Sequence, residues 1–105
     1  MILIFGGTTE GRTAAETLDE AGQPFYYSTR GTLQEVTCRN MTRLTGNMDS
    51  EKIISFCREH DIRLIIDAAH PFAQQLHLNI FLAAKELTIK VVRLERIYPE
   101  LSEEI

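Results

Sequence analysis

Cysteine, positive charge and long apolar stretches are all scarce in this sequence. The two cysteines, Cys38 and Cys57, lie far apart and neither belongs to a Cys-x-x-Cys pair, which argues against a zinc site and against a disulfide framework. With 11 basic and 15 acidic side chains the formal net charge is -4, so the chain lacks the excess of positive charge that nucleic acid or an anionic membrane attracts. No apolar run approaches the ~20 residues of a membrane-spanning helix.

The start of the chain also lacks the charged region and cleavage site of a secretory signal peptide, because the apolar run at residues 2–5 directly follows Met1. We therefore expect a cytoplasmic protein. The 105 residues, 44% hydrophobic and 25% charged, have the composition of one globular domain that can form a core without disulfides or a structural metal.

Apolar patterning predicts strands separated by helices. Uninterrupted apolar runs are typical of strands buried on both faces of a parallel sheet, and they occur at residues 2–5 and 64–66. A last strand is expected at residues 89–92. An aromatic run predicts another strand at residues 25–27. Between residues 33 and 47 the pattern is ambiguous, because two stretches have the composition of short strands, at 36–38 and 41–45.

Helical spacing of apolar residues predicts three helices. The first follows Gly6-Gly7 and is capped by Thr8 or Thr9, the second is capped by Asp49 or Ser50, and the third extends from Pro71 to Leu87. Short connections and right-handed crossovers then favour an α/β fold, a Rossmann-like open and mostly parallel sheet with helices on both faces in three α/β/α layers.

Ligands of such sheets bind beyond the carboxyl ends of the strands, so the residues that follow each strand carry the functional information. The first group is Gly-Gly-Thr-Thr-Glu-Gly-Arg at residues 6–12. Gly6 and Gly11 match the first and third glycines of the dinucleotide-binding motif, whereas Thr8 replaces the second. Glycines permit a tight turn, and the free N–H groups of a helix start can hold a phosphate; the alternative is a plain turn between strand and helix.

The second group is Ser28, Thr29 and Arg30, where a domain that binds NAD would carry an acidic residue for the ribose diol. Arg30 comes about 20 residues after Gly11, the spacing expected for the ribose-recognising position. A cation with two hydroxyl groups suits a 2′-phosphate, which favours NADP over NAD. The alternative is a solvated loop.

The third group is Asp67, Ala68 and His70, at the end of a strand and before a helix. We expect Asp67 to brace the neighbouring loops and His70 to contact a cofactor or substrate; the alternative for His70 is a loop residue bonded to the backbone. For His60 and His77 ordinary structural roles are sufficient.

Together the three groups resemble the N-terminal half of the precorrin-6A reductase family of cobalamin biosynthesis. That family's Gly-Gly-Thr-x-Glu-x-Arg appears here at residues 6–12, its Asp-Ala-Thr-His-Pro-Phe-Ala at residues 67–73 and its Arg-Leu-Glu-Arg at residues 93–96. Three positions differ from the family pattern, which has a threonine, a small hydroxyl residue and a proline in place of Ala69, His77 and Ile97.

The resemblance implies an NADPH-dependent reductase that delivers hydride to precorrin-6A or cobalt-precorrin-6A and saturates one double bond of the corrin ring. Family members have two α/β domains and are well over twice as long. We therefore expect residues 1–96 to form the NADPH-binding Rossmann-like N-terminal domain, and residues 97–105 to be a linker or the start of a missing C-terminal domain. The tetrapyrrole substrate would bind together with that second domain, so the present chain alone is expected to be inactive.

The resemblance also implies roles for individual residues, although it identifies no catalytic residue. No metal site is expected. The phosphates would be held by Gly6, Gly7, Thr8 and Thr9, the 2′-phosphate by Ser28, Thr29 and Arg30, and the nicotinamide side by Asp67, Ala68 and His70. Arg12 would either neutralise a phosphate or pair with Glu16.

Three other interpretations are open. An extended short-chain dehydrogenase shares the Gly-Gly-Thr opening, but Thr9 and Arg12 occupy the positions of its later glycines and no Tyr-x-x-x-Lys pair follows. A non-catalytic dinucleotide-binding module, regulatory or for interaction, would bind cofactor without turnover. A flavodoxin-like domain fits less well, because Arg30 and the short glycine turn favour a dinucleotide.

Overall fold

The computed structural model describes residues 1–31 and 34–95, and within them the chain forms five strands and three helices. In chain order these elements are β1 (Ile2–Phe5), α1 (Thr9–Glu20), β2 (Phe25–Thr29), β3 (Met41–Thr45), α2 (Ser50–Glu59), β4 (Leu64–Asp67), α3 (Gln74–Leu87) and β5 (Lys90–Arg93). None of the helices in this described part is long and apolar enough to cross a bilayer. The segment 97–105, expected to be a linker or the start of a second domain, lies outside the described residues.

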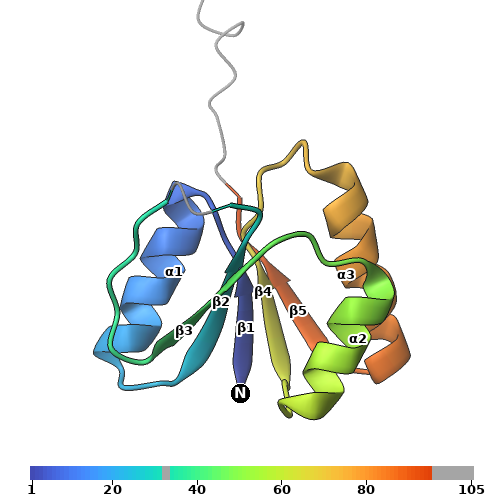
Figure 1. Ribbon diagram of the computed structural model, residues 1–105, viewed down its shortest axis with the longest axis horizontal. Helices are drawn as coiled ribbons and strands as arrows, with labels where there is room; N and C mark the ends of the chain where they lie inside the picture. The colour runs from blue at the N-terminus through green and yellow to red at the C-terminus, as the bar shows by residue number, and fades with distance from the viewer. Residues whose placement is uncertain (32–33, 96–105) are drawn as a thin grey trace, which may run out of the picture.

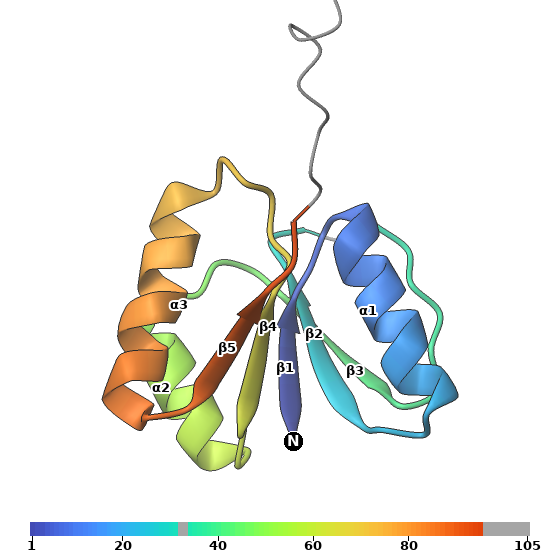
Figure 2. The same ribbon diagram turned by 180° about the vertical axis from the view of Figure 1, so that it is seen from behind.

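The strands form one parallel sheet in the order β3-β2-β1-β4-β5. Helix α1 covers one face of this sheet, and α2 and α3 lie side by side on the other (Figures 1 and 2). The predicted fold class, a Rossmann-like sheet between two helical layers, is confirmed. The direction of chain progression reverses between β1 and β4, and this switch point is where open α/β sheets bind ligands.

The core consists of one cluster on each face of the sheet. Along β1, Leu3 and Phe5 pack under α2 and α3, whereas Ile4 packs toward α1. All three side chains are buried, as expected for a central parallel strand covered on both sides. Tyr27 of β2 is fully buried in the α1 cluster together with Phe25.

The stretch at residues 36–38 is not a strand, and that alternative is wrong. The segment runs extended along the α1 side of the molecule, where Val36 and Cys38 pack against the core cluster. Its end is fixed to α1, because the Asn40 backbone N–H donates to Asp19 Oδ1 at 2.8 Å. This hydrogen bond is the main reason that the pKa of Asp19 lies below its usual range. Half-buried and exposed residues therefore alternate along this segment because it packs against the core, and not because it pairs with the sheet.

Helix α3 begins at Gln74, later than the predicted start at Pro71. Residues 70–73 form a turn instead, in which the Ala73 N–H donates to the His70 carbonyl at 2.9 Å. The helical conformation is disfavoured for a residue that precedes proline, so His70 lies outside the helix. The turn that its carbonyl closes with Ala73 then moves the start of α3 to Gln74. Phe72, which falls within the predicted helix, belongs to this turn and is 83% exposed.

The two cysteines differ in reactivity. Burial raises the pKa of the Cys57 thiol to about 11, and this side chain is almost fully buried between α2 and the sheet. Cys38 is half-buried, and its pKa is raised as well. Because the thiolate is the reactive form, we expect an aromatic disulfide reagent at pH 8 to modify Cys38 first and Cys57 only after unfolding in guanidinium. A Cys38→Ala variant should lack the early phase; an early phase that persists in this variant would contradict the assignment.

Candidate functional site

A cavity of about 1100 Å³ opens at the carboxyl edge of the sheet. Its wall comes from the β1–α1 turn, the end of β2, the β3–α2 loop and the β4–α3 loop. Seven of the ten predicted site residues line it: Gly6, Gly7, Thr8, Ser28, Thr29, Arg30 and His70. The other three, Thr9, Asp67 and Ala68, do not line the cavity, although each lies within three residues of one of these seven.

The glycine turn is shaped by a side chain beneath it. A Cβ atom on Gly6 would lie 2.2 Å from Tyr27 Cζ, and a Cβ atom on Gly11 would lie 2.9 Å from Gly6 Cα. Gly7 has a φ of +93°, which glycine adopts without strain. The turn between β1 and α1 therefore needs glycine at residue 6 for close approach to Tyr27 and at residue 7 for its backbone conformation.

Side chains also bind the polar groups of this turn. The Gly7 N–H donates to the Tyr27 hydroxyl oxygen at 3.2 Å, and that hydroxyl donates to Gln34 Oε1 at 2.6 Å. The Gln34 amide in turn donates to the Thr8 carbonyl at 2.8 Å. Burial raises the pKa of Tyr27. Gly7 thus has its N–H satisfied within the protein, whereas the Thr9 N–H belongs to the first turn of α1, where the helix supplies no acceptor.

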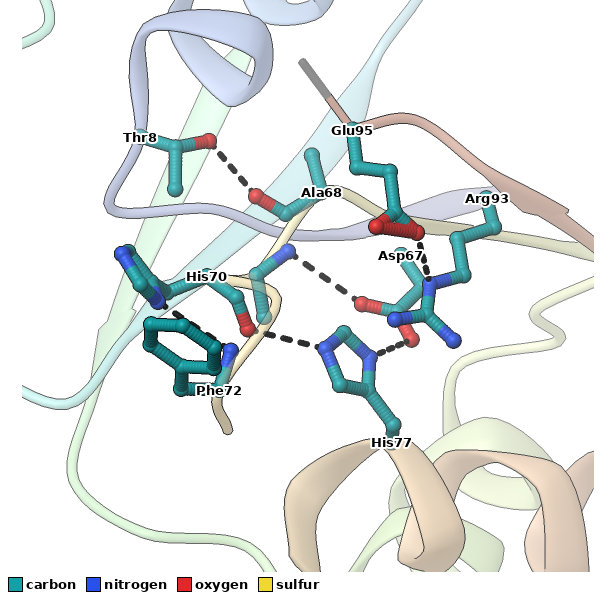
Figure 3. A network of polar contacts seen from close by, with 9 residues as sticks. Thr8, Asp67, Ala68, His70, Phe72, His77, Arg93 and Glu95 are labelled. Carbon is teal, nitrogen blue, oxygen red and sulfur yellow. Dashed lines mark hydrogen bonds and ion pairs between the residues drawn. The ribbon is translucent and has the colours of Figure 1, made fainter. Parts of the chain in front are cut away.

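Thr8 joins the β1–α1 turn to the end of β4, a neighbour of β1 in the sheet. Its hydroxyl donates to the Ala68 carbonyl at 2.6 Å and accepts the Gly11 N–H at 3.0 Å, so that it caps α1 as predicted (Figure 3). The Ala68 N–H donates to the Phe5 carbonyl at 2.8 Å. Ala68 therefore acts through its backbone, in holding the ends of β1 and β4 together at the switch point.

At the end of β2 the hydroxyl groups face inward and the cation faces outward. Ser28 and Thr29 are buried, and the Thr29 hydroxyl donates to the Gly31 carbonyl at 2.5 Å while it accepts from Arg43 Nη2 at 2.9 Å. Arg30 is exposed at the cavity wall, and its Nε donates to Asn47 Oδ1 at 3.1 Å. Of these three, Arg30 has the side chain placed to reach a charged ligand.

Arg43 is a cation that the sequence analysis did not identify. It belongs to β3, and its guanidinium carbon lies 5.5 Å from the centre of the Tyr27 ring. Its contact with Thr29 places a second positive charge at the end of β2. Nothing in the local sequence distinguishes this arginine from a surface residue of an edge strand.

Asp67 at the end of β4 is buried and bonded within the protein. Its Oδ1 accepts the Ala69 N–H at 3.2 Å, and its Oδ2 lies 2.5 Å from His77 Nδ1 (Figure 3). His77 Nε2 in turn lies 2.9 Å from the His70 carbonyl oxygen. Asp67 thus braces the neighbouring loop. His77, for which the sequence suggested only an ordinary structural role, is its partner.

His70 lines the cavity and is exposed. Its Nδ1 accepts the Phe72 N–H at 3.1 Å, and the two rings are 5.2 Å apart. In the neutral ring the remaining proton is therefore on Nε2, which makes that nitrogen a donor. The β4–α3 loop offers the cavity one imidazole and one exposed aromatic ring.

Comparison with known proteins gives a consistent set of relatives. A family model described as "Precorrin-6x reductase CbiJ/CobK" matches residues 1–104. Cobalt-precorrin-6A reductase of Priestia megaterium is 32% identical over 98 residues, which cover 91% of this chain and 38% of that protein. Precorrin-6A reductase of a Sinorhizobium species is 33% identical over 100 residues, which cover 90% of this chain and 37% of that protein. The chain thus spans less than half the length of these relatives.

Two solved structures share the fold. A structure titled "CobK precorrin-6A reductase" matches with a TM-score of 0.84 and 25% identity, over 94% of this chain and 40% of that one. UDP-D-quinovosamine 4-dehydrogenase from Vibrio fischeri matches with a TM-score of 0.59 and 18% identity, over 98% of this chain and 80% of that one. The second likeness concerns the fold alone.

Proposed function

This chain belongs to the precorrin-6x reductase family, and we propose that it is the NADPH-binding part of a reductase that saturates one double bond of precorrin-6A or cobalt-precorrin-6A in cobalamin biosynthesis. The observation that carries this proposal is the cavity of about 1100 Å³ at the switch point of the sheet, lined by the glycine turn and by Arg30. Its position is that of the ligand crevice in dinucleotide-binding folds, and its size suits an elongated ligand.

The residues present fit a dinucleotide phosphate. The packing of Gly6 over Tyr27 allows the tight turn between β1 and α1, and the start of α1 contributes its positive dipole end and the N–H of Thr9. Arg30 is the residue proposed to bind the 2′-phosphate that distinguishes NADPH from NADH. When bound, the cofactor supplies the hydride.

The other predicted residues act mainly by shaping the site. Ser28 and Thr29 are buried at the end of β2, and the Thr29 hydroxyl bonds to the Gly31 carbonyl beside Arg30. Asp67 and Ala68 fix the end of β4, and His70 faces the nicotinamide side of the proposed site. Turnover of a tetrapyrrole is proposed to require the remaining length found in the relatives, so this chain alone should bind cofactor without reducing substrate.

The proposal is tested by calorimetric titration of the purified chain with NADPH and with NADH, in parallel with an Arg30→Ala variant. We expect NADPH to bind about tenfold or more tightly than NADH, because a charge-assisted hydrogen bond to phosphate contributes roughly 1.5–3 kcal/mol. Arg30→Ala should abolish this preference and leave NADH binding unchanged. The matched control is Arg58→Ala, which removes an exposed arginine that pairs with Glu86 away from the cavity.

Equal binding of the two nucleotides would refute the role of Arg30, and no binding of either would refute a complete cofactor site on this chain. The non-catalytic alternative is tested separately. It predicts that the chain, once joined to the remaining length of a relative, still binds NADPH but does not reduce precorrin-6A, whereas our proposal predicts that reduction is restored.

A further inference from the structure

A buried polar network at the end of β4 has no part in the ligand contacts proposed above. It joins the Asp67 carboxylate, the His77 imidazole from the first turn of α3, and the His70 carbonyl (Figure 3). The Asp67 and His77 side chains are 4% and 10% exposed, respectively. The network therefore connects a strand end, a helix start and the intervening loop at the wall of the cavity.

When Asp67 is ionised, both contacts of the His77 ring are with groups that accept a hydrogen bond. Nδ1 of His77 faces a carboxylate oxygen and Nε2 faces a carbonyl oxygen, and a carbonyl can only accept. A neutral imidazole has a single N–H, so it can donate to only one of these two groups. Both contacts are hydrogen bonds when the ring carries two protons and Asp67 is ionised. Asp67 is suited to that state, because its other oxygen accepts the Ala69 N–H.

Other charged and titratable groups lie around the network. Arg93 of β5 is the register partner of Asp67, and its Nε pairs with Glu95 at 2.9 Å. The Leu94 N–H donates to the Asp67 carbonyl at 2.9 Å. On the loop side the exposed ring of His70 is a further titratable group. The cation on β5 beside the Asp67–His77 pair, Arg93, is thus already paired with Glu95. The Asp67–His77 pair itself carries no net charge when the ring holds both protons and Asp67 is ionised.

We propose that His77 is a positioning residue, which in its doubly protonated form ties Asp67 to the His70 carbonyl and so fixes the β4–α3 loop that lines the cavity. Loss of one proton from the ring breaks one of these two links and loosens residues 69–73. The identity of the ligand affected rests on the proposed function, and for a nicotinamide dinucleotide this loop is the nicotinamide side of the site.

The loop part of this proposal is tested without any ligand. In the wild-type chain the His77 ring is titrated by ¹⁵N NMR, and amide hydrogen-exchange protection is measured over the same pH range at Ala69 and Ala73, corrected for the intrinsic rate at each pH. We expect protection to fall about tenfold as His77 loses its second proton. The Gly11 and Lys52 amides, which bond to the caps of α1 and α2, should not change. Loss of the ring proton without loss of protection at Ala69 and Ala73 would overturn the proposal.

Variants separate positioning from general stability. His77→Gln should lower protection at Ala69 and Ala73 about tenfold at low pH and remove its pH dependence. Asp67→Asn keeps the shape of the side chain and should lower protection to a similar extent. The matched control is His60→Gln, because His60 ends α2 and bonds to the Tyr26 hydroxyl far from the loop. If His60→Gln had the same effect on the loop, the role assigned to His77 would be refuted.

The ligand part is tested with NADPH as the probe. The wild-type affinity should fall with rising pH in step with the His77 titration, and His77→Gln should bind several-fold more weakly at low pH without that dependence. An affinity that is unaffected by His77→Gln, although the loop has lost protection, would overturn positioning toward the cofactor. If the wild-type chain bound no NADPH, the proposed function would fail, and the exchange data would still decide whether His77 fixes the loop.

Discussion

Replacing Gly6 by alanine is expected to destabilise the protein by about 3 kcal/mol, the upper part of the range for overpacked cores. The added methyl group would lie 2.2 Å from Tyr27 Cζ and 2.3 Å from its hydroxyl oxygen. Tyr27 is fully buried and bonded on both sides, so its ring cannot move aside. Urea unfolding followed by circular dichroism gives the change in the free energy of unfolding.

Gly31→Ala is the matched control for this prediction. A Cβ atom at Gly31 meets no atom within 4 Å, and its φ lies outside the left-handed region, so the expected change is within about 0.5 kcal/mol. The contact itself is tested in a Tyr27→Leu background, where the shorter side chain should reduce the cost of Gly6→Ala. An equal cost in both backgrounds would show that the clash with Tyr27 is not the cause.

The sequence predicted the features that depend on local patterning. The apolar run of β1, the stop at Gly6-Gly7 and the caps at Thr8 and Asp49 are each determined by a few neighbouring residues, and the structure agrees. The glycine motif predicts that Gly6 lies close to a phosphate, whereas the protein atoms that lie close to Gly6 belong to Tyr27. That contact joins residues on two strands, and no local pattern reports it.

The wrong predictions arose where two structures share one local pattern. Residues 36–38 alternate in burial as a strand does, but β2 has β1 on one side and β3 on the other, so no sheet edge next to β2 remains for them. Similarly, Pro71 is acceptable in a first helical turn, yet the hydrogen bond between Ala73 and the His70 carbonyl closes a turn first. In both cases tertiary contacts decide between the alternatives.

The candidate site was only partly predictable for the same reason. The rule that ligands bind at strand ends identified the residues that line the cavity, including Arg30 and His70. It did not show that the Asp67 carboxylate faces inward, because its partner His77 belongs to the following helix. The sequence thus predicted several residues of the cavity wall, and the three-dimensional contacts separate the residues that line the cavity from those that support its wall.

The second large effect is expected for Tyr27→Phe, which should lower the free energy of unfolding by about 1–3 kcal/mol at pH 7. The substitution keeps the packing of the ring but removes the hydroxyl group that accepts from Gly7 and donates to Gln34. The Gly7 N–H and Gln34 Oε1 then lie beside the ring without a hydrogen-bond partner. An unsatisfied polar group costs more free energy of folding than its hydrogen bond contributes. Tyr26→Phe is the control on the same strand, since it removes the bond of Tyr26 to His60 on the opposite face and leaves the glycine turn intact.

The pH dependence of this variant gives an independent test. Because burial raises the pKa of Tyr27 above its ordinary value of 10.0, the hydroxyl group favours the folded state fully below pH 10 and loses this contribution as the pH rises through its folded-state pKa. Tyr27→Phe has no such group, so the difference in stability between wild type and variant should shrink above pH 10. Urea unfolding at pH 7 and at pH 10.5 measures it. A difference that grows with pH would mean that the ionised phenolate is stabilised in the fold, by Arg43 beside the ring, and would contradict burial as the dominant influence on Tyr27.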